Sequence, residues 1–193
     1  MNTNAYSPQI ILGVCVAAFV LLLLIVWLVS QRRSHHRTTA LRERFGPEYD
    51  VAVQEYGSRR KAEDALEARL RHVQALTLRP LDDTARRRYL AEWDSIQARF
   101  VDHPRGAVIE ADELISTILT ARGYTGSRFD QRVADLSVNH ARLVDPYRRA
   151  NAVVVKAGRN EATTEELRST MILYRALFED LLQSKTVMMP RAA

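Results

Sequence analysis

The sequence predicts an all-α protein in which one N-terminal transmembrane helix is followed by a soluble bundle of six or seven helices. Three observations support this prediction. Residues 10–29 form an uncharged, strongly apolar run. Beyond this run, apolar residues recur at spacings of three and four, and no alternating pattern indicates a strand. Glycines, prolines and N-capping residues separate the helical segments from one another.

The run 10–29 has the length and composition of an uncleaved membrane anchor. At 1.5 Å per residue, its helix would span roughly 30 Å, the thickness of the hydrocarbon core. Fifteen of its twenty residues are Leu, Ile, Val or Phe. A cleaved signal peptide fits less well, because Met1–Gln9 contains no Lys or Arg and no AxA site follows the run. A lipoprotein site at Cys15 is also disfavoured, because the bulky Val14 precedes it.

Basic residues directly after the run predict its orientation. Arg32, Arg33 and Arg37 follow the run, and residues 1–42 contain no acidic residue. By the positive-inside rule, these arginines place the C-terminal domain in the cytoplasm and the short N-terminus outside. They could also contact anionic lipid, at roughly 1 kcal/mol per residue. A topology signal alone is the favoured interpretation.

The predicted organisation has five parts. They are an extracytoplasmic N-terminus (1–9), the transmembrane helix (10–29), a basic juxtamembrane segment (30–43), a helical domain (44–183) and a frayed tail (184–193). The roughly 160 residues outside the anchor are enough for a hydrophobic core without a metal or a disulfide. A single cysteine also rules out an intramolecular disulfide.

The net charge of +5 arises beside the membrane segment rather than in the domain. Residues 1–42 hold four arginines, which leaves 24 basic and 23 acidic residues beyond them. A nucleic-acid-binding domain normally carries a basic stripe. We therefore predict no nucleic-acid partner.

Helix boundaries in the first part of the domain follow capping residues. Gly46 and Pro47 begin a short helix that ends at Gly57. Ser58 begins a second helix, which ends before Pro80. The apolar faces of the two helices are Tyr49, Val53 and Tyr56 in the first, and Ala62, Leu66, Leu70 and Val73 in the second.

Two further helices are predicted between residues 82 and 123. Asp82 or Asp83 caps the first of them, and Asp102 or His103 opens the second before Pro104. Gly123 follows the second helix as its C′ residue. Their apolar faces are Tyr89, Trp93, Ile96 and Phe100, and Val108, Ala111, Leu114, Ile115, Ile118 and Leu119.

The following segment is predicted to hold a brief helix and a longer one. The brief helix carries Phe129, Val133 and Leu136 and ends before Ser137. The longer helix begins at Asp145 and Pro146 and ends at Gly158, because Pro is favoured at the first helical position. A Pro-kinked helix that starts near Asn139 is the alternative.

A capping box predicts where the last helix begins. Thr163 and Glu166 have the required spacing, because each side chain can satisfy a free backbone N–H near the other residue. The seam expected to face the core is Leu167, Met171, Tyr174, Phe178 and Leu181.

The histidines lack metal-binding patterns. They are His35, His36, His72, His103 and His140. None lies four residues from another or three residues after a glutamate, so HExxH and ExxH motifs are absent. The glycines show neither GxGxxG nor GxxxxGK spacing. We therefore predict no metal-binding and no cofactor-binding residue.

One segment contains the residue types of a hydrolase triad. Ser137, His140 and either Asp135 or Asp145 lie within eleven positions. Such triads are normally assembled from distant segments, and no nucleophile elbow is present. Helix capping by Ser137 or Asn139 is the favoured interpretation, and we predict no catalytic residue.

Two charged clusters are interpreted as solvated helix faces. Glu110, Asp112 and Glu113 would perform acid–base chemistry only if they were buried together. The run Arg86–Arg88 is closely flanked by acidic residues, so it lacks the net charge of a phosphate-binding stripe. The aromatic stripe Tyr89, Trp93 and Phe100 is interpreted as core rather than as a cofactor site.

Several strings resemble one protein family. They are RFGPEYD (Arg44–Asp50), RPL (Arg79–Leu81), RYLAEWDSIQARFVDHP (Arg88–Pro104), ADELI, RGY, DLSV and TTEELRSTMILYRALFEDLL. Across Arg44–Leu182 the chain resembles a family of small single-pass bacterial membrane proteins with no assigned activity. Asn139 and Pro146 depart from its pattern, where an acid and a non-proline are expected. The resemblance implies a bacterial inner-membrane location and adds nothing on mechanism.

These observations favour a non-enzymatic interaction module. The anchor would contact the lipid bilayer through residues 10–29 and present the helical domain to a protein partner or to another copy of the chain. The alternatives are a small-ligand binder or enzyme with a pocket between helices, and a lipid-surface protein that uses the juxtamembrane arginines.

Overall fold

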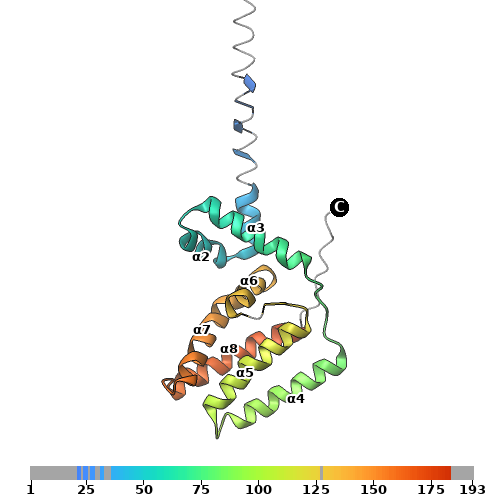
Figure 1. The fold of residues 1–193 in the computed structure, drawn as a ribbon, viewed down its shortest axis with the longest axis vertical. Coiled ribbons are helices and arrows are strands. Elements are labelled where there is room, and N and C mark those ends of the chain that lie inside the picture. Colours follow the sequence, from blue (N-terminus) through green and yellow to red (C-terminus); the bar gives the residue numbers. More distant parts are fainter. Residues whose placement is uncertain are drawn as a thin grey trace, which may run out of the picture. The chain divides into compact units, whose positions relative to one another are not determined.

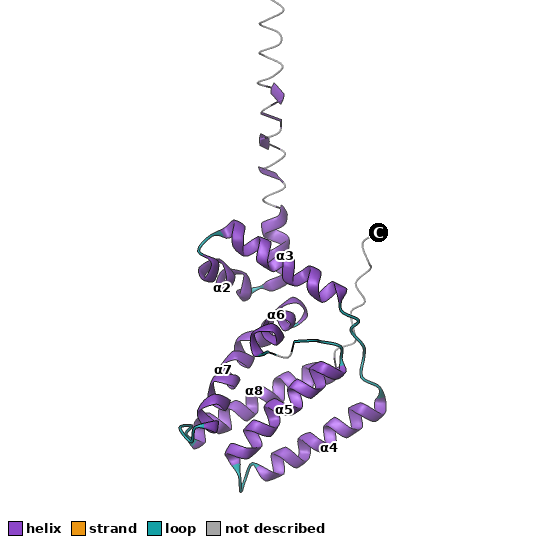
Figure 2. Cartoon of the chain, in the orientation of Figure 1, coloured by secondary structure: helices purple, strands orange, loops and turns teal. Residues whose placement is uncertain are grey.

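The computed structural model is helical throughout its regular elements. It describes residues 21–22, 24–25, 27–28, 31–32, 36–126 and 128–183. Every regular element in these residues is a helix, and Figures 1 and 2 show only helices and loops in the described part. The predicted all-α class is therefore confirmed. The chain divides into two compact units, residues 1–43 and 44–193.

The predicted transmembrane helix lies largely outside the described residues. Its six described residues, between Leu21 and Leu28, are helical and exposed. Among the described residues, no helix combines the length and the apolar character needed to cross a membrane. The predicted N-terminus (1–9) and tail (184–193) also lie outside the described part of the chain.

The second unit is built from seven described helices. They are α2 (Pro47–Tyr56), α3 (Arg59–Ala75), α4 (Asp83–Arg99), α5 (Pro104–Ala121), α6 (Phe129–Asn139), α7 (Ala141–Gly158) and α8 (Thr164–Gln183). Helices α5, α7 and α8 pack against one another, and α4 packs on α5 (Figure 1). Helices α2 and α3 form a hairpin that packs on α7 and α6.

The main hydrophobic core lies among α4 to α8. Trp93 of α4 stacks on Phe178 of α8, with ring centroids 4.8 Å apart and an interplanar angle of 16°. Tyr147 and Tyr174 meet edge to face at 6.5 Å, a favoured arrangement of aromatic rings. The predicted seam of α8 is confirmed, since all five of its residues are buried.

The predicted boundaries of α2 and α3 are confirmed, but the buried face of α2 differs from the predicted apolar face. Gly57 ends α2 in the left-handed conformation, with φ of 64°. Tyr49 is buried and donates a hydrogen bond of 2.9 Å to Glu63 Oε1 of α3. Tyr56 is exposed, whereas the polar residue Glu48 is buried. An ion pair described below accounts for the burial of Glu48.

Helices α4 and α5 begin, and α5 ends, where the capping residues predict. Asp82, rather than Asp83, is the N-cap of α4, and its Oδ1 accepts a 2.6 Å hydrogen bond from the Ala85 backbone N–H. His103 is the N-cap residue of α5. Gly123 follows α5 with φ of 93°, in the region that favours glycine.

The predicted end of α6 and the predicted start of α7 are wrong, whereas α7 ends at Gly158 as predicted. Helix α6 continues through Ser137 to Asn139, and α7 begins at Ala141, so Pro146 lies inside α7. The alternative of a helix that starts near Asn139 and contains Pro146 is therefore the correct one. Proline lacks the N–H for the bond to the carbonyl four residues earlier. Burial of Val144 and Tyr147 on either side of Pro146 offsets this loss.

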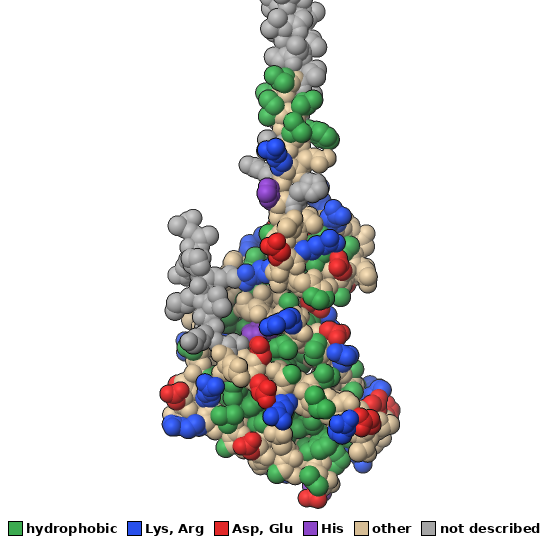
Figure 3. Space-filling model, turned by 180° about the vertical axis from the view of Figure 1, so that it is seen from behind, with side chains coloured by type: hydrophobic (Ala, Val, Ile, Leu, Met, Phe, Trp, Pro, Cys, Tyr) green, Lys and Arg blue, Asp and Glu red, His purple; other side chains and the backbone are tan. Residues whose placement is uncertain are grey.

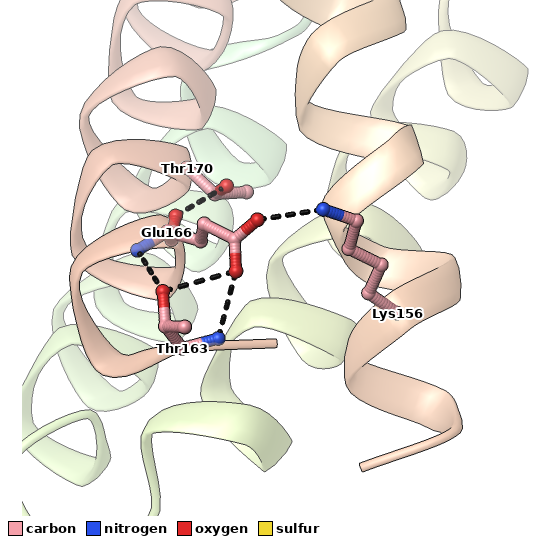
Figure 4. Close-up of polar contacts among 4 residues, drawn as sticks. All are labelled: Lys156, Thr163, Glu166 and Thr170. Carbon is pink, nitrogen blue, oxygen red and sulfur yellow. Dashed lines mark hydrogen bonds and ion pairs between the residues drawn. The ribbon is translucent and has the colours of Figure 1, made fainter. Parts of the chain in front are cut away.

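The predicted capping box of α8 is confirmed (Figure 4). The Glu166 backbone N–H donates to Thr163 Oγ1 at 3.2 Å, and the Thr163 backbone N–H donates to Glu166 Oε2 at 2.8 Å. Lys156 Nζ of α7 donates to Glu166 Oε1 at 2.7 Å. These hydrogen bonds from Lys156 and Thr163 lower the pKa of Glu166 to about 2. The loop between α7 and α8 is thus held at both of its ends.

Candidate functional site

A shallow, mostly apolar hollow lies between α4 and α8. Its volume is about 200 Å³, and it is open to solvent. The two helices both pack on α5, and the stacked rings of Trp93 and Phe178 bridge them. The hollow is lined by Gln97, Phe100, Arg168, Met171, Ile172 and Arg175.

Helix α8 presents an exposed stripe beside this hollow. Ile172, at its centre, is 56% exposed although it is a large aliphatic residue in the middle of a helix. Ser169 and Ala176 lie about one turn before and after it and are also exposed. The stripe, called the α8 stripe below, comprises Glu165, Arg168, Ser169, Ile172, Arg175, Ala176 and Glu179.

Ion pairs order the charged residues of the α8 stripe. Arg168 Nε donates to Glu165 Oε2 at 2.8 Å, and Arg175 Nε donates to Glu179 Oε1 at 2.9 Å. Pairs three or four residues apart on an exposed helix face contribute little to stability, roughly 0.3 to 0.5 kcal/mol. They do hold the long arginine side chains along the helix, on either side of Ile172.

Charges of both signs are mixed over the surface of the second unit. On the face shown in Figure 3, basic and acidic side chains alternate, and apolar side chains lie between them. The Arg86–Arg88 run is exposed, and Arg88 stacks over the Tyr89 ring at 4.8 Å. The run therefore lies on an exposed helix face, and its expected lack of phosphate binding stays a prediction.

A pair between the buried His140 and the half-buried Asp180 joins the α6–α7 junction to α8. His140 Nδ1 and Asp180 Oδ2 lie 2.5 Å apart, and the His140 side chain is only 8% exposed. Nearby, the buried Arg122 donates to the backbone carbonyl of Leu181, and Asn139 Nδ2 donates to the Tyr124 hydroxyl at 3.4 Å. Burial lowers the pKa of His140, although Asp180 acts to raise it. The pKa of His140 therefore lies below its ordinary value, with burial outweighing the nearby carboxylate.

Replacing Asp180 with asparagine is expected to lower the pKa of His140 further. The substitution removes the charge and hydrogen bond that favour the imidazolium, while burial and the charges of Arg122 and Arg142 remain. Histidine ring signals followed by NMR across pH would give this pKa. Asp145→Asn is the control, because Asp145 is exposed and pairs with Arg149. An unchanged or higher pKa of His140 in Asp180→Asn would contradict the claim that Asp180 raises this pKa.

The same pair predicts how stability varies with pH. The pKa of His140 is lower in the folded chain than its ordinary value of 6.5, so the unfolded chain binds the proton more readily. The contribution of His140 to the free energy of unfolding is therefore present above pH 6.5 and is lost as the pH falls through the folded-state pKa of His140.

The residues of the hypothetical triad do not assemble. Ser137 is buried inside α6, where its Oγ donates to the Ala134 carbonyl at 2.6 Å. His140 pairs with Asp180 instead of Asp135 or Asp145. The capping interpretation is also wrong, because Ser137 lies within α6 and the N-cap residue of α7 is His140.

The acidic cluster of α5 separates into different environments. Glu110 pairs with Arg99 of α4. Asp112 faces α8, where its Oδ1 accepts a 2.8 Å hydrogen bond from the Tyr174 hydroxyl, and Glu113 is exposed. Burial and the charge of Asp112 raise the pKa of Tyr174, so its hydroxyl keeps its proton. Asp112 therefore anchors α5 to α8, and it does not form a carboxylate pair with Glu110.

The aromatic stripe of α4 belongs largely to the core. Tyr89 and Trp93 are buried, which confirms their interpretation as core. Phe100 is half-buried and lines the hollow. Within the described residues, no three His, Cys, Asp or Glu side chains are placed to hold a metal ion.

The residues predicted for topology or lipid contact belong to the first unit. Arg32 is exposed and Arg37 is half-buried. Arg33 and His35 lie outside the described residues, and His36 is exposed. The predicted lipid contact stays a prediction.

Several buried polar contacts could not be found from sequence patterns. Asp135 is buried in α6, accepts a 2.7 Å hydrogen bond from Gln131 and lies 3.6 Å from His72 of α3. Burial raises the pKa of Asp135. His72 and Asp135 are far apart in the chain, as are His140 and Asp180, so no local spacing indicates either pair.

No protein-family model, curated protein or solved structure shows significant similarity to the chain.

Proposed function

We propose that this protein is a membrane-anchored, non-enzymatic interaction module. A transmembrane helix at residues 10–29 would hold the helical unit at the cytoplasmic face of a bacterial inner membrane. The hollow between α4 and α8, together with the α8 stripe, would bind a protein partner.

The exposure of Ile172 carries the binding part of the proposal. A large aliphatic side chain that is 56% exposed beside an apolar hollow leaves apolar area in water. Burying such area contributes about 25 cal/mol per Å². Phe100 and Met171 extend the apolar surface, and charged residues surround it. An apolar centre with a charged rim is the usual anatomy of a protein-binding surface.

The apolar run and the arginines after it support the anchor. Twenty uncharged residues match the hydrocarbon thickness, and Arg32, Arg33 and Arg37 favour a cytoplasmic C-terminal unit. Reporters that are active only in the cytoplasm or only in the periplasm, fused to the C-terminus, would test the orientation in a bacterial host. Activity of the periplasmic reporter alone would reverse the proposed topology.

Co-purification from membranes with two matched variants tests the binding surface. Ile172→Asp places a charge at the centre of the α8 stripe and is expected to abolish recovery of the partner. Val51→Asp is the control, because Val51 is similarly exposed on α2, away from the hollow. Partner recovery that is unaffected by Ile172→Asp would argue against this surface, and recovery of no partner by the unmodified chain would argue against the function.

A further inference from the structure

We propose that the α2–α3 hairpin is a cap that opens from α6 and α7 as one piece while helices α4 to α8 stay folded. The closed cap covers part of the surface of α6 and α7, so its opening controls access to that surface. This inference goes beyond the proposed function, because it requires neither the membrane anchor nor a partner on α8.

The hairpin has buried apolar residues that are separate from the main hydrophobic core. These residues do not belong to the core of α4 to α8, and they include Tyr49, Ala52, Ala62 and Leu66. Helices α2 and α3 pack on each other, and the Tyr49 hydroxyl donates a hydrogen bond to Glu63 across the two helices. Movement of the hairpin away from α6 and α7 therefore leaves the core of α4 to α8 buried.

Contacts between charged side chains join the hairpin to α6 and α7. Arg148 of α7 donates to both carboxylate oxygens of Glu48 in α2. His72 Nε2 of α3 lies 3.6 Å from Asp135 Oδ1 of α6. The side chains of Glu48 and Asp135 are only 4% and 2% exposed. A buried ion pair adds little net stability, because its charges regain hydration when they separate. Opening this boundary therefore costs less than separating two helices of the core, which would expose apolar residues to water.

The closed cap leaves one buried carboxylate oxygen without a hydrogen bond. Asp135 Oδ1 accepts a hydrogen bond from Gln131, whereas Asp135 Oδ2 has no partner in the part of the chain that the structure describes. A buried acceptor that lacks a donor costs free energy, and contact with water removes this cost. Hydration of Asp135 in the open state thus offsets part of the contacts that opening breaks.

Helix α6 has a second buried face, which lies under the cap. Val133 belongs to the core of α4 to α8, whereas Val138 is 3% exposed and lies outside that core. Val138 follows Asp135 by three residues, so the two side chains share one face of the helix. Asp135 faces His72 of α3, so Val138 is covered by the hairpin. Opening of the cap exposes Val138 together with the Asp135 carboxylate.

The two ends of the hairpin allow it to move as one piece. Its N-terminal end follows the division between the two units at residue 43. There, Arg44 donates to Asn139 of α6 at 3.4 Å, which is long for a hydrogen bond. At the other end, Leu76 leaves α3 with an extended backbone. The following segment stays on the bundle, because the Arg79 backbone N–H donates to the Arg122 carbonyl at 2.9 Å. The hinge therefore lies at the end of α3.

Thiol labelling of two valine positions in α6 tests the cap. Val138→Cys and Val133→Cys are made separately in the full-length chain without its native cysteine (Cys15→Ser), in detergent micelles. The two valines are 3% and 5% exposed in the same helix, and only Val133 belongs to the main core. Each labelling rate with a water-soluble maleimide is divided by the rate for the same variant in urea, which removes differences in thiol reactivity.

We expect Val138→Cys to be labelled at least about tenfold faster than Val133→Cys, because opening of the cap requires less free energy than unfolding of the core. Equal relative rates at the two positions, or faster labelling of Val133→Cys, would overturn the proposal.

Removal of the Glu48 charge tests the contact that closes the cap. Glu48→Gln leaves Arg148 without its counterion, so it is expected to accelerate labelling of Val138→Cys at least about tenfold and to leave the rate of Val133→Cys unchanged. Glu55→Gln is the matched control, because Glu55 is an exposed acid on the same helix, and it should change neither rate. Equal acceleration of both cysteines by Glu48→Gln would show that the hairpin does not open separately from the core. No acceleration of Val138→Cys would show that the ion pair does not hold the cap. Either result would contradict the proposal.

Discussion

Replacing Trp93 with alanine is expected to lower the free energy of unfolding by about 3 to 5 kcal/mol. Trp93 is 4% exposed and stacks on Phe178, so its removal opens a cavity between α4 and α8 and eliminates the ring contact that bridges them. Tyr89 and Ile96 are the other buried residues of α4. Far-UV circular dichroism during urea unfolding of the full chain in detergent would measure the loss.

Leu90→Ala is the matched control for Trp93→Ala. Leu90 lies on the same helix but is 41% exposed, so the change should lower the free energy of unfolding by no more than about 1 kcal/mol, as expected for exposed sites. Equal losses in the two variants would show that the stacked rings do not hold α4 in place.

Replacing Gly123 with alanine is expected to lower the free energy of unfolding by about 3 kcal/mol or more. Gly123 has φ of 93°, which other residues rarely adopt, and an added Cβ would lie 2.4 Å from the Thr77 carbonyl oxygen. That oxygen belongs to the segment between α3 and α4, which the Arg79 backbone N–H joins to the Arg122 carbonyl at 2.9 Å. Relieving the clash would therefore pull this segment away from the end of α5. Thermal unfolding followed by circular dichroism would show the loss.

Gly57→Ala separates the effect of backbone conformation from that of the clash. Gly57 also has positive φ, at 64°, but an added Cβ meets nothing within 4 Å. Gly57→Ala should therefore lower the free energy of unfolding by only about 1 to 2 kcal/mol, the cost of the left-handed conformation for alanine. If Gly123→Ala were no worse than Gly57→Ala, the contact with Thr77 would be unimportant.

Local signals in the sequence were sufficient for most helix boundaries. These signals are the capping box of Thr163 and Glu166, the N-cap Asp82 and the terminating glycines Gly57 and Gly123. Each depends on residues within about one helical turn, so a short stretch of sequence is enough to predict it. The buried seam of α8 was predictable for the same reason, since one amphipathic face repeats along twenty residues.

The start of α7 could not be predicted locally, because packing outweighs a proline. Asp145 and Pro146 have the right order for a helix start, yet burial of Val144 before them extends α7 back to Ala141. The benefit of that burial depends on surfaces of other helices, which the local sequence does not contain.

The candidate binding surface was only partly visible in the sequence. Met171 belongs to the predicted buried seam of α8, whereas the neighbouring Ile172 does not. An aliphatic residue outside the buried face was the one feature of the sequence that indicated an exposed apolar surface on α8. The hollow itself depends on how α4 and α8 lie on α5. Contacts between distant residues, such as His140 with Asp180, likewise required the fold.

The ion pair between α2 and α7 constrains how this protein can change during evolution. Arg148 donates to both carboxylate oxygens of Glu48, with an Nη2–Oε2 distance of 3.0 Å, and Glu48 is buried. Losing either residue alone leaves a charge without its counterion, whereas replacing both with apolar residues of similar volume can be tolerated. We therefore expect homologues either to keep Glu48 and Arg148 or to replace both together. In both cases the α2–α3 hairpin should stay packed on α7.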